Sequence, residues 1–435
     1  MVKEKVLIMI TYIDLFCGIG GFRQGIERVC KNINEDSKCI FACDKDIHAA
    51  KIYKLNYGED VFYDLKSSTT HDLIEKRMCT LTKNKELDFI FAGFPCQSFS
   101  KAGNQEGFKD EEKGNLFFEI IKIAKKYHPK FMLLENVRNL KSHDGGNTWK
   151  QINYHLKKSG YHVDHVVLSP NQIPNKKIPA LRDRVFILCY RNDLFYKNIY
   201  VFNDKKLDRV KTSIYTYGKN GKKLNSKYFE DDQQHYLDEH TIKTLEMWDD
   251  FRNRILENGG KMISPIWPHY FSDFNISDKP LWKQMIINRN REFYKKHKDV
   301  VEKFKKAQDE ILDYIKANKD YAKHLDSLIK SDKKLEWNAG EKLESIFDGI
   351  IQFRPSGVRV KAPTDIPTLV AINQTPIIGF EKRYMTPEEI RKLYGFKKLK
   401  FTNQPEKQTY KQLGNTVSVD VIEYLITHMV EANNI

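Results

Sequence analysis

Short apolar runs alternate with helix-like segments through the first third of this 435-residue chain. The runs are rich in Ile, Phe and Val and end in turn-forming residues, which is typical of buried strands. The predicted strands cover residues 11–16, 39–43, 61–63, 87–92 and 131–134. The predicted helices between them cover residues 22–30, 47–55, 71–79 and 115–127. This alternation predicts an α/β fold built on a Rossmann-like, doubly wound parallel sheet.

Chemically useful residues follow most of these strands. The first strand runs into Cys17-Gly-Ile-Gly-Gly21, and Asp44, Asp64 and Glu135-Asn136 follow later strands. Ligands of open α/β sheets bind at the carboxyl ends of the strands. A single carboxylate or amide there is also a common turn or helix-cap residue, so each position alone is ambiguous.

Cys96 follows the strand at 87–92, after Gly93 and Pro95 break the apolar run. A cysteine is more often a small apolar core residue than a reactive thiol. The polar segment 101–113, with Gly103 and Gly107, comes next and is predicted to be a loop over the site. The stretch therefore presents a thiol where ligands bind, without settling its role.

The glycine turn at residues 17–21 is suited to close approach of a ligand to the backbone. Its glycines lack the Gly-x-Gly-x-x-Gly spacing of the dinucleotide fingerprint. Asp44 lies about 20 residues beyond the turn, where an acidic residue is placed to bind ribose hydroxyls. Arg182 and Arg184 precede the strand at 185–188 and alternate onto one face, although a solvated edge would have the same pattern.

Charge and cysteine content limit the classes of function. Lys and Arg exceed Asp and Glu by 15, which favours a polyanionic partner, unless it reflects a Lys-rich source. Seven cysteines without a Cys-x-x-Cys pair indicate reduced thiols, a cytoplasmic protein and no metal site. The run at residues 6–10 is too short for a signal peptide, and no apolar run is long enough for a membrane span.

The pattern changes after residue 190. Residues 191–350 are polar and charged and lack the strand–helix alternation, so they are predicted to form a separate domain or insert. Within it, residues 296–334 have a helical pattern. Strand character returns at 351–361 and 366–371. Thr386-Pro-Glu-Glu389 is a capped helix start, and an apolar helix is predicted at 419–429.

Five motifs occur in a fixed order: Asp-Leu-Phe-Cys-Gly-Ile-Gly-Gly, Gly-Phe-Pro-Cys-Gln-Ser-Phe-Ser, Glu-Asn-Val, Arg-Asp-Arg and Gln-Leu-Gly-Asn-Thr-Val. In this order the sequence closely resembles the bacterial DNA (cytosine-5)-methyltransferases of restriction–modification systems. The resemblance covers about residues 1–190 and 351–435. It implies a catalytic and cofactor-binding domain at 1–190, completed by 380–435. It also implies a DNA-binding target-recognition domain at 191–379, with a variable insert at 191–350.

The resemblance implies the catalytic residues. Cys96 would add to C6 of a cytosine flipped out of duplex DNA, which makes C5 nucleophilic. Glu135 would hold a proton at N3, and Asn136 would help to read the exocyclic amine. Arg182 and Arg184 would support the charge that develops and keep Cys96 ionised.

The resemblance also implies S-adenosyl-L-methionine as the methyl donor. Its site would comprise Asp14, Phe16, Gly18, Ile19, Gly20, Asp44, Lys45, Asp64, Leu65, Pro95, Leu116, Asn415 and Thr416. Residues near the DNA backbone would be Gln97, Ser98, Ser100, Arg359 and Thr368. Double-stranded DNA is the expected partner, and the protein is expected to act as a monomer. Whether a cognate restriction endonuclease exists stays open.

Two positions depart from the family pattern. Lys45 stands where many relatives have an apolar or aromatic residue, and Ala180 stands where the family has Gln before the two arginines. Cys17, in the glycine turn, is expected to be inert. Two alternatives are weighed against DNA methylation: a tRNA-type cytosine-5 RNA methyltransferase and a catalytically silent DNA-binding relative. The large segment 191–350 argues against the first, and the filled chemical positions argue against the second.

Overall fold

The computed structural model describes residues 9–81, 86–95, 116–194, 202, 206–218, 221–232, 234–317, 333–369 and 374–431. The chain divides into two compact units. Unit 1 comprises Met1–Thr212 with Ile390–Ile435, and unit 2 comprises Ser213–Glu389. The chain thus leaves unit 1 after residue 212 and returns to it at residue 390, whereas the predicted domain boundaries lie after 190 and before 380.

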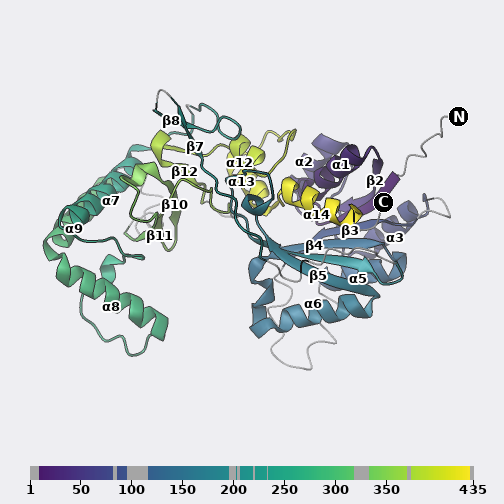
Figure 1. The fold of residues 1–435 in the computed structure, drawn as a ribbon, viewed down its shortest axis with the longest axis horizontal. Coiled ribbons are helices and arrows are strands. Elements are labelled where there is room, and N and C mark those ends of the chain that lie inside the picture. The colour runs from purple at the N-terminus through teal and green to yellow at the C-terminus, as the bar shows by residue number, and fades with distance from the viewer. Residues whose placement is uncertain are drawn as a thin grey trace. The chain divides into compact units, whose positions relative to one another are not determined.

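The main sheet of unit 1 has six strands in the order β2-β1-β3-β4-β6-β5 among the described residues (Figure 1). The strands are β1 Met9–Leu15, β2 Asp36–Cys43, β3 Phe89–Gly93, β4 Phe131–Val137, β5 Tyr161–Leu168 and β6 Arg184–Arg191. β1 pairs in parallel with β2 and β3, and β3 pairs in parallel with β4. The ends of these four strands therefore meet at one side of the sheet, which we call the carboxyl edge.

β6 departs from the predicted parallel sheet, because it runs antiparallel to both β4 and β5. Antiparallel neighbours need no helical crossover between them. The register pairs Val137 of β4 with Arg184 of β6. The start of β6 therefore lies beside the end of β4, and the arginines that precede and open β6 reach the carboxyl edge.

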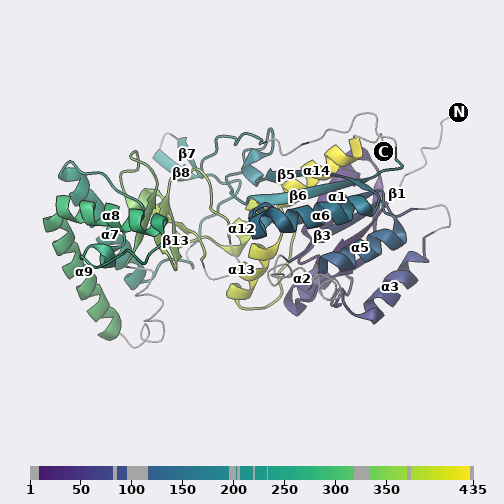
Figure 2. The same cartoon turned by 90° about the horizontal axis from the view of Figure 1, so that it is seen from below.

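Helices cover both faces of this sheet, as Figure 2 shows. The helices of unit 1 include α1 Gly21–Ile33, α2 Ile47–Tyr57, α3 Ser68–Met78, α5 Leu116–Tyr127, α6 Asn147–Lys158, α13 Glu406–Asn415 and α14 Val419–Glu431. Phe89 and Phe91 of β3 pack in the same core as α1 and α14. Ile90 and Ala92 pack in the opposite core, with α3, α5 and α6. The alternation along β3 thus buries both faces, as expected for a central strand.

Gly25 permits the close packing of α1 against α14. A Cβ atom at this position would lie 2.4 Å from Cγ2 of Ile422. The C-terminal helix therefore completes the core of the N-terminal segment, although almost the whole chain separates them in sequence.

The sheet of unit 2 has the order β13-β12-β10-β11-β9 in the described chain. Its strands are β9 Leu335–Asn338, β10 Ile350–Arg354, β11 Gly357–Lys361, β12 Ile377–Ile378 and β13 Arg383–Tyr384. A hairpin pairs β7 Tyr215–Gly218 with β8 Gly221–Leu224. The helices are α7 Glu239–Glu257, α8 Leu281–Lys296 and α9 Lys298–Ala317. The buried Trp248 of α7 packs on Phe304 of α9, with ring centroids 4.4 Å apart.

Short 3₁₀ segments connect several of these elements, although Asp144 and Gly145 in one of them have non-helical φ/ψ angles. They are η2 Arg138–Lys141, η3 His143–Gly146, η4 Pro170–Gln172, η5 Pro268–Tyr270, η6 Ile346–Asp348 and η7 Gly379–Glu381. None of the described helices is both long and apolar enough to cross a bilayer.

Three predicted elements differ from the structure. The strand at 61–63 is reduced to one bridge between Asp44 and Phe62. The helix predicted at 296–334 corresponds to α9, which ends at Ala317; residues 318–332 lie outside the described chain. Of the strand predicted at 366–371, the described residues 366–369 contain only a bridge position at Ile366.

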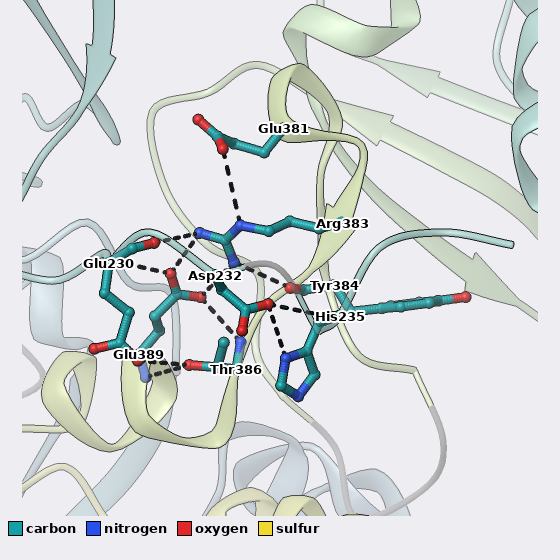
Figure 3. A network of polar contacts seen from close by, with 8 residues as sticks. All are labelled: Glu230, Asp232, His235, Glu381, Arg383, Tyr384, Thr386 and Glu389. Atoms are coloured by element: carbon teal, nitrogen blue, oxygen red, sulfur yellow. Dashed lines mark hydrogen bonds and ion pairs between the residues drawn. The ribbon is translucent and has the colours of Figure 1, made fainter.

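A buried ion pair fixes the start of α12 (Pro387–Leu393), as Figure 3 shows. The two terminal guanidinium nitrogens of Arg383, Nη2 and Nη1, donate to Glu389 at 2.7 and 3.1 Å, and neither side chain is exposed. Glu389 also accepts from the backbone N–H of Thr386, whose hydroxyl accepts from the N–H of Glu389. This reciprocal arrangement is a capping box, which confirms the predicted helix start.

Candidate functional site

A pocket of about 380 Å³ opens at the carboxyl edge of the unit 1 sheet. Most of the predicted catalytic and cofactor residues line it, from segments spread over most of the chain. They are Phe16, Gly18, Ile19, Asp44, Pro95, Glu135, Asn136, Arg182, Arg184, Asn415 and Thr416. The structure thus gathers the ends of β1, β2, β3 and β4, the start of β6 and the end of α13 around one cavity.

The glycine turn forms one wall of this pocket. Phe16, Gly18 and Gly20 all have positive φ angles, of 58°, 54° and 89°. A Cβ at Gly20 would lie 2.4 Å from the ring of Tyr57, so this position needs both the conformation and the small size of glycine. Gly20 precedes α1 without a side-chain cap, and the first backbone N–H groups of α1 therefore suit a carboxylate.

Asp44 at the end of β2 is held by the turns on either side of it. Its Oδ2 accepts from the N–H of Gly18 at 2.8 Å, and its Oδ1 accepts from the N–H of Asp46 at 2.7 Å. Burial raises the pKa of Asp44, against the effect of these two hydrogen bonds. Each carboxylate oxygen can accept a second hydrogen bond, so Asp44 can still bind a pair of hydroxyl groups in the pocket.

Asp14 lies inside β1 and is fully buried, two residues before Phe16, which lines the pocket. Neither of its carboxylate oxygens accepts a hydrogen bond from the described part of the chain. Burial raises the pKa of Asp14 well above its usual range, against the opposing charge of Arg23. Such a group requires either a proton or a polar partner.

Glu135 and Arg184 form the charged centre of the pocket. The Nε of Arg184 donates to Oε1 of Glu135 at 2.9 Å, and both side chains are largely buried. Burial raises the pKa of Glu135, although the charges of Arg184 and Arg182 oppose the shift. Burial and the like charge of Arg182 lower the pKa of Arg184 to about 10. A carboxyl group with a raised pKa is suited to hold and deliver a proton.

Arg182 is anchored by contacts that its sequence neighbours do not reveal. Its backbone N–H donates to Oγ of Ser169 at 2.8 Å, and its Nη2 donates to the carbonyl of Gly414 at 3.1 Å. The ring of Tyr394 lies 5.3 Å from the guanidinium carbon. Ala180, at the position where Gln was expected, is buried. The C-terminal segment therefore supplies contacts to this arginine within unit 1.

Asn136 fixes the turn that leads from β3 toward Cys96. Its Nδ2 donates to the carbonyl of Phe94 at 2.9 Å, and its Oδ1 accepts from the N–H of Val137 at 2.8 Å. One N–H of the amide stays available to the pocket. Asn136 therefore holds the backbone carbonyl of Phe94, the residue before Pro95, by a direct hydrogen bond.

Cys96, Gln97, Ser98 and Ser100, with the loop predicted at 101–113, lie outside the described residues. Burial raises the pKa of Cys17, Cys30, Cys39, Cys43 and Cys189. These thiols are therefore poor nucleophiles. Cys79 is exposed but follows α3, on the approach to the start of β3 rather than at the carboxyl edge.

Several predicted residues do not line the pocket. Gly20 and Asp14 are close in sequence to lining residues. Leu65 is buried in a hydrophobic core, and Leu116, the first residue of α5, packs against that core. The Nζ of Lys45 lies 4.0 Å from Asp64, and both side chains are largely exposed. In unit 2, Arg359 pairs with Glu336 at 2.5 Å, and Thr368 is half-buried outside the strands.

The pocket also contains residues that were not predicted. They are Asp46, Ala49, Gly93, Phe94, Val137, Gln412 and Gly414. All lie within four residues of predicted positions, and Gln412 and Gly414 belong to the Gln-Leu-Gly-Asn-Thr-Val motif. Tyr394 had no sequence signal, because it contacts Arg182 only in the folded chain. Within the described residues, no group of three or more His, Cys, Asp or Glu could hold a metal ion.

Known proteins match this chain over nearly its whole length. M.HgiCI of Herpetosiphon aurantiacus, a type II methyltransferase, is 29% identical over 96% of this chain and 97% of its own. The type II methyltransferase M.BanI of Aneurinibacillus aneurinilyticus is 28% identical over 98% and 96%. The solved structure of the Entamoeba histolytica methyltransferase EhMeth has a TM-score of 0.49 at 18% identity, covering 98% of each chain. That likeness is too low to add to the assignment.

A family model described as C-5 cytosine-specific DNA methylase matches residues 10–431. The match includes the glycine turn, the strand ends and the C-terminal motif that together form the pocket. The chain therefore belongs to the C-5 cytosine-specific DNA methylase family, the class of methyltransferase that its motifs predict.

Proposed function

We propose that this protein transfers a methyl group from S-adenosyl-L-methionine to C5 of a cytosine that is flipped out of duplex DNA. The observation that carries the proposal is the Glu135–Arg184 pair, at 2.9 Å, in the same pocket as Asp44 and the glycine turn. One end of the pocket thus suits a base that must be protonated, and the other suits a ribose and an amino-acid carboxylate.

The cofactor wall fits S-adenosyl-L-methionine. Asp44 has acceptor capacity for the ribose hydroxyls, and the uncapped start of α1 suits the methionine carboxylate. Asn415 and Thr416 line the same cavity, and Oγ1 of Thr416 would lie 3.0 Å from a Cβ atom at Gly21, the first residue of α1. Bound there, the cofactor supplies an electrophilic methyl group on a positively charged sulfur.

The reaction would use Cys96 as its nucleophile. Its thiolate forms a bond to C6 of cytosine, and Glu135 gives a proton to N3 as the ring loses its aromatic character. C5 then takes the methyl group, and S-adenosylhomocysteine is released. Water would take the proton from C5, and the C6–S bond would break with its electrons on the sulfur of Cys96. N3 would return its proton to Glu135, which restores the aromatic ring and the enzyme. Arg184 and Arg182 stabilise the charge on the base and on Glu135 throughout.

Duplex DNA is the substrate in this proposal, and unit 2 would select the sequence. The surplus of 15 positive charges favours a polyanionic partner. Flipping is required because C5 and C6 must meet the donor and the nucleophile inside the pocket. The sequence that is recognised would be read in the major groove by residues of unit 2.

Transfer of tritiated methyl groups tests the proposal. Purified protein with labelled S-adenosylmethionine should label genomic duplex DNA, but not tRNA, and digestion should yield 5-methylcytosine. Cys96→Ser should abolish transfer and keep cofactor binding, whereas Cys79→Ser serves as the matched control and should keep both. Label in tRNA alone would favour an RNA methyltransferase, and DNA binding without transfer would favour a silent relative.

A further inference from the structure

A second cavity in unit 1, of about 710 Å³, has a strongly basic lining. Four of its residues carry positive charges: Arg138, Lys141, Lys206 and Arg209. Asp183 is the one carboxylate among the residues that line it. We call this cavity the basic pocket. None of its residues is assigned above to catalysis or to the cofactor.

The basic pocket adjoins the candidate active site along two chain segments. Val137 lines the active site, and Arg138, the next residue, lines the basic pocket. Asp183 lies between Arg182 and Arg184, which both line the active site. Because β4 and β6 pair Val137 with Arg184, both segments leave the active site at the same point.

Asp183 organises the guanidinium groups of the basic pocket. Its Oδ2 accepts from Nη1 of Arg138 at 3.1 Å, and its Oδ1 accepts from Nη2 of Arg209 at 3.2 Å. The side chains of Arg138 and Arg209 remain 65% and 48% exposed. The Asp183 carboxylate thus orients the two arginines. It offsets only one of the four positive charges that line the basic pocket, so the pocket keeps a net positive charge.

The segment that carries Lys206 and Arg209 is held against the loop after β5. The N–H of Val210 donates to the carbonyl of Asn171 at 2.8 Å. The side chain of Gln172 donates to the carbonyl of Leu207 at 2.5 Å. These contacts bring cations from separate parts of unit 1 into one cavity, so the charge cluster is a product of the fold.

We propose that the basic pocket binds backbone phosphates of the DNA strand that carries the flipped cytosine. This inference rests on the proposed function, because the flipped nucleotide would occupy the adjoining site and its flanking phosphates would lie just outside. Oriented guanidinium groups match the geometry of phosphate oxygens, and the surrounding lysines add charge. Such contacts position the strand without reading its sequence.

The test is the salt dependence of binding to a labelled random-sequence duplex, followed by fluorescence anisotropy. The variant is Arg138→Gln/Arg209→Gln, which keeps hydrogen-bond donors beside Asp183. Its plot of log K against log salt concentration should be shallower by about 0.9 for each phosphate that the protein no longer neutralises. Arg138→Lys/Arg209→Lys should retain most of the slope. Lys126→Gln is the matched control, since Lys126 also pairs with an exposed carboxylate but lies just before β4 begins, away from the carboxyl edge.

A kinetic measurement supplies a second readout. For methyl transfer, the double Gln variant should have a KM for DNA that is about tenfold or more higher, with kcat within about twofold of the wild-type value. The reason is that the phosphate contacts bind the substrate and the transition state equally. Titration of S-adenosylmethionine by calorimetry should give the wild-type affinity and verify the fold. If the double variant does not fold, Lys206→Gln should still reduce the slope by about one unit.

An unchanged salt slope in the folded double variant, or in Lys206→Gln, would overturn the inference. The anisotropy readout needs no turnover, so it separates this inference from the proposed function. If the variants show the expected slope changes but the wild-type protein transfers no methyl group, only the proposed function is contradicted.

Discussion

The Nε of Arg184 donates to Oε1 of Glu135 at 2.9 Å, across the antiparallel pairing of β4 and β6. The pairing depends on the reversal of β6, since a parallel strand would carry its first residue to the opposite edge. Burial raises the pKa of Glu135 while the arginine limits the rise. The pair therefore joins a proton carrier to a cation at the place where charge would develop on the base.

Replacing Glu135 by Gln should slow methyl transfer by about 10²- to 10⁴-fold, the range typical of a missing general acid. Affinity for S-adenosylmethionine should stay within about twofold, because Asp44 and the glycine turn form a separate wall. The rate is measured by tritium transfer at saturating DNA. Glu75→Gln, which breaks an exposed pair with Lys126, should keep the wild-type rate. Full activity of Glu135→Gln would rule out its proton-transfer role.

Tyr394 should act as a positioning residue for Arg182. Tyr394→Leu removes the ring that lies 5.3 Å from the guanidinium, an interaction worth about 0.5–2 kcal/mol. We expect kcat to fall about two- to thirtyfold, with little change in the KM for S-adenosylmethionine. Tyr394→Phe keeps the ring and should restore most of the rate. Equal decreases in both variants would point to the hydroxyl group instead.

Asp14 should make stability fall as pH rises. Its folded-state pKa is raised, so the protonated form favours the folded state. That contribution is complete below the unfolded pKa of about 3.9 and disappears as pH rises toward the raised folded value. Asp14→Asn stays neutral, so its melting temperature in the absence of cofactor should exceed that of the wild type increasingly above pH 4. If the plots of melting temperature against pH run parallel for the two proteins, ionisation of Asp14 does not destabilise the folded protein.

Variants of the Arg383–Glu389 pair and of Thr386 can separate the contribution of the buried charge to stability from that of the helix cap. Glu389→Gln keeps a side chain that can complete the capping box but removes the carboxylate that pairs with both terminal nitrogens of the buried Arg383. We expect a decrease of about 3–5 kcal/mol in the free energy of unfolding of unit 2. Thr386→Ala removes the cap and should cost about 1 kcal/mol.

Urea unfolding monitored by Trp fluorescence measures both decreases, since Trp248 lies in the core of unit 2. Glu381→Gln is the control, because Glu381 is partly exposed and lies 4.0 Å from Arg383. The replacement Arg383→Met/Glu389→Leu should recover most of the stability that Glu389→Gln removes. If the double replacement is as unstable as the single one, the uncompensated charge is not the cause.

Much of the site could be predicted because it lies at strand ends. Apolar runs that stop at Asp44 or Glu135 reveal both the strand and the residue that emerges from it. The direction of β6 could not be predicted, since its apolar run is compatible with either orientation. The contact of Tyr394 with Arg182 and the basic pocket around Asp183 join segments far apart in sequence. The pairing of Arg359 with Glu336 depends on the register of β11 and β9, which alternation alone does not fix.

Covalent trapping tests the central claim most directly. The substrate is a pool of genomic fragments amplified with 5-fluorocytosine in place of cytosine, so no recognition sequence needs to be known. Fluorine at C5 cannot leave as a proton does, and the bond from Cys96 to C6 should therefore persist after methyl transfer. With S-adenosylmethionine, wild-type protein should form a denaturation-resistant adduct with this DNA, and Cys96→Ser should form none. An adduct that persists in Cys96→Ser, or its absence from wild-type protein that methylates DNA, would contradict the proposed mechanism.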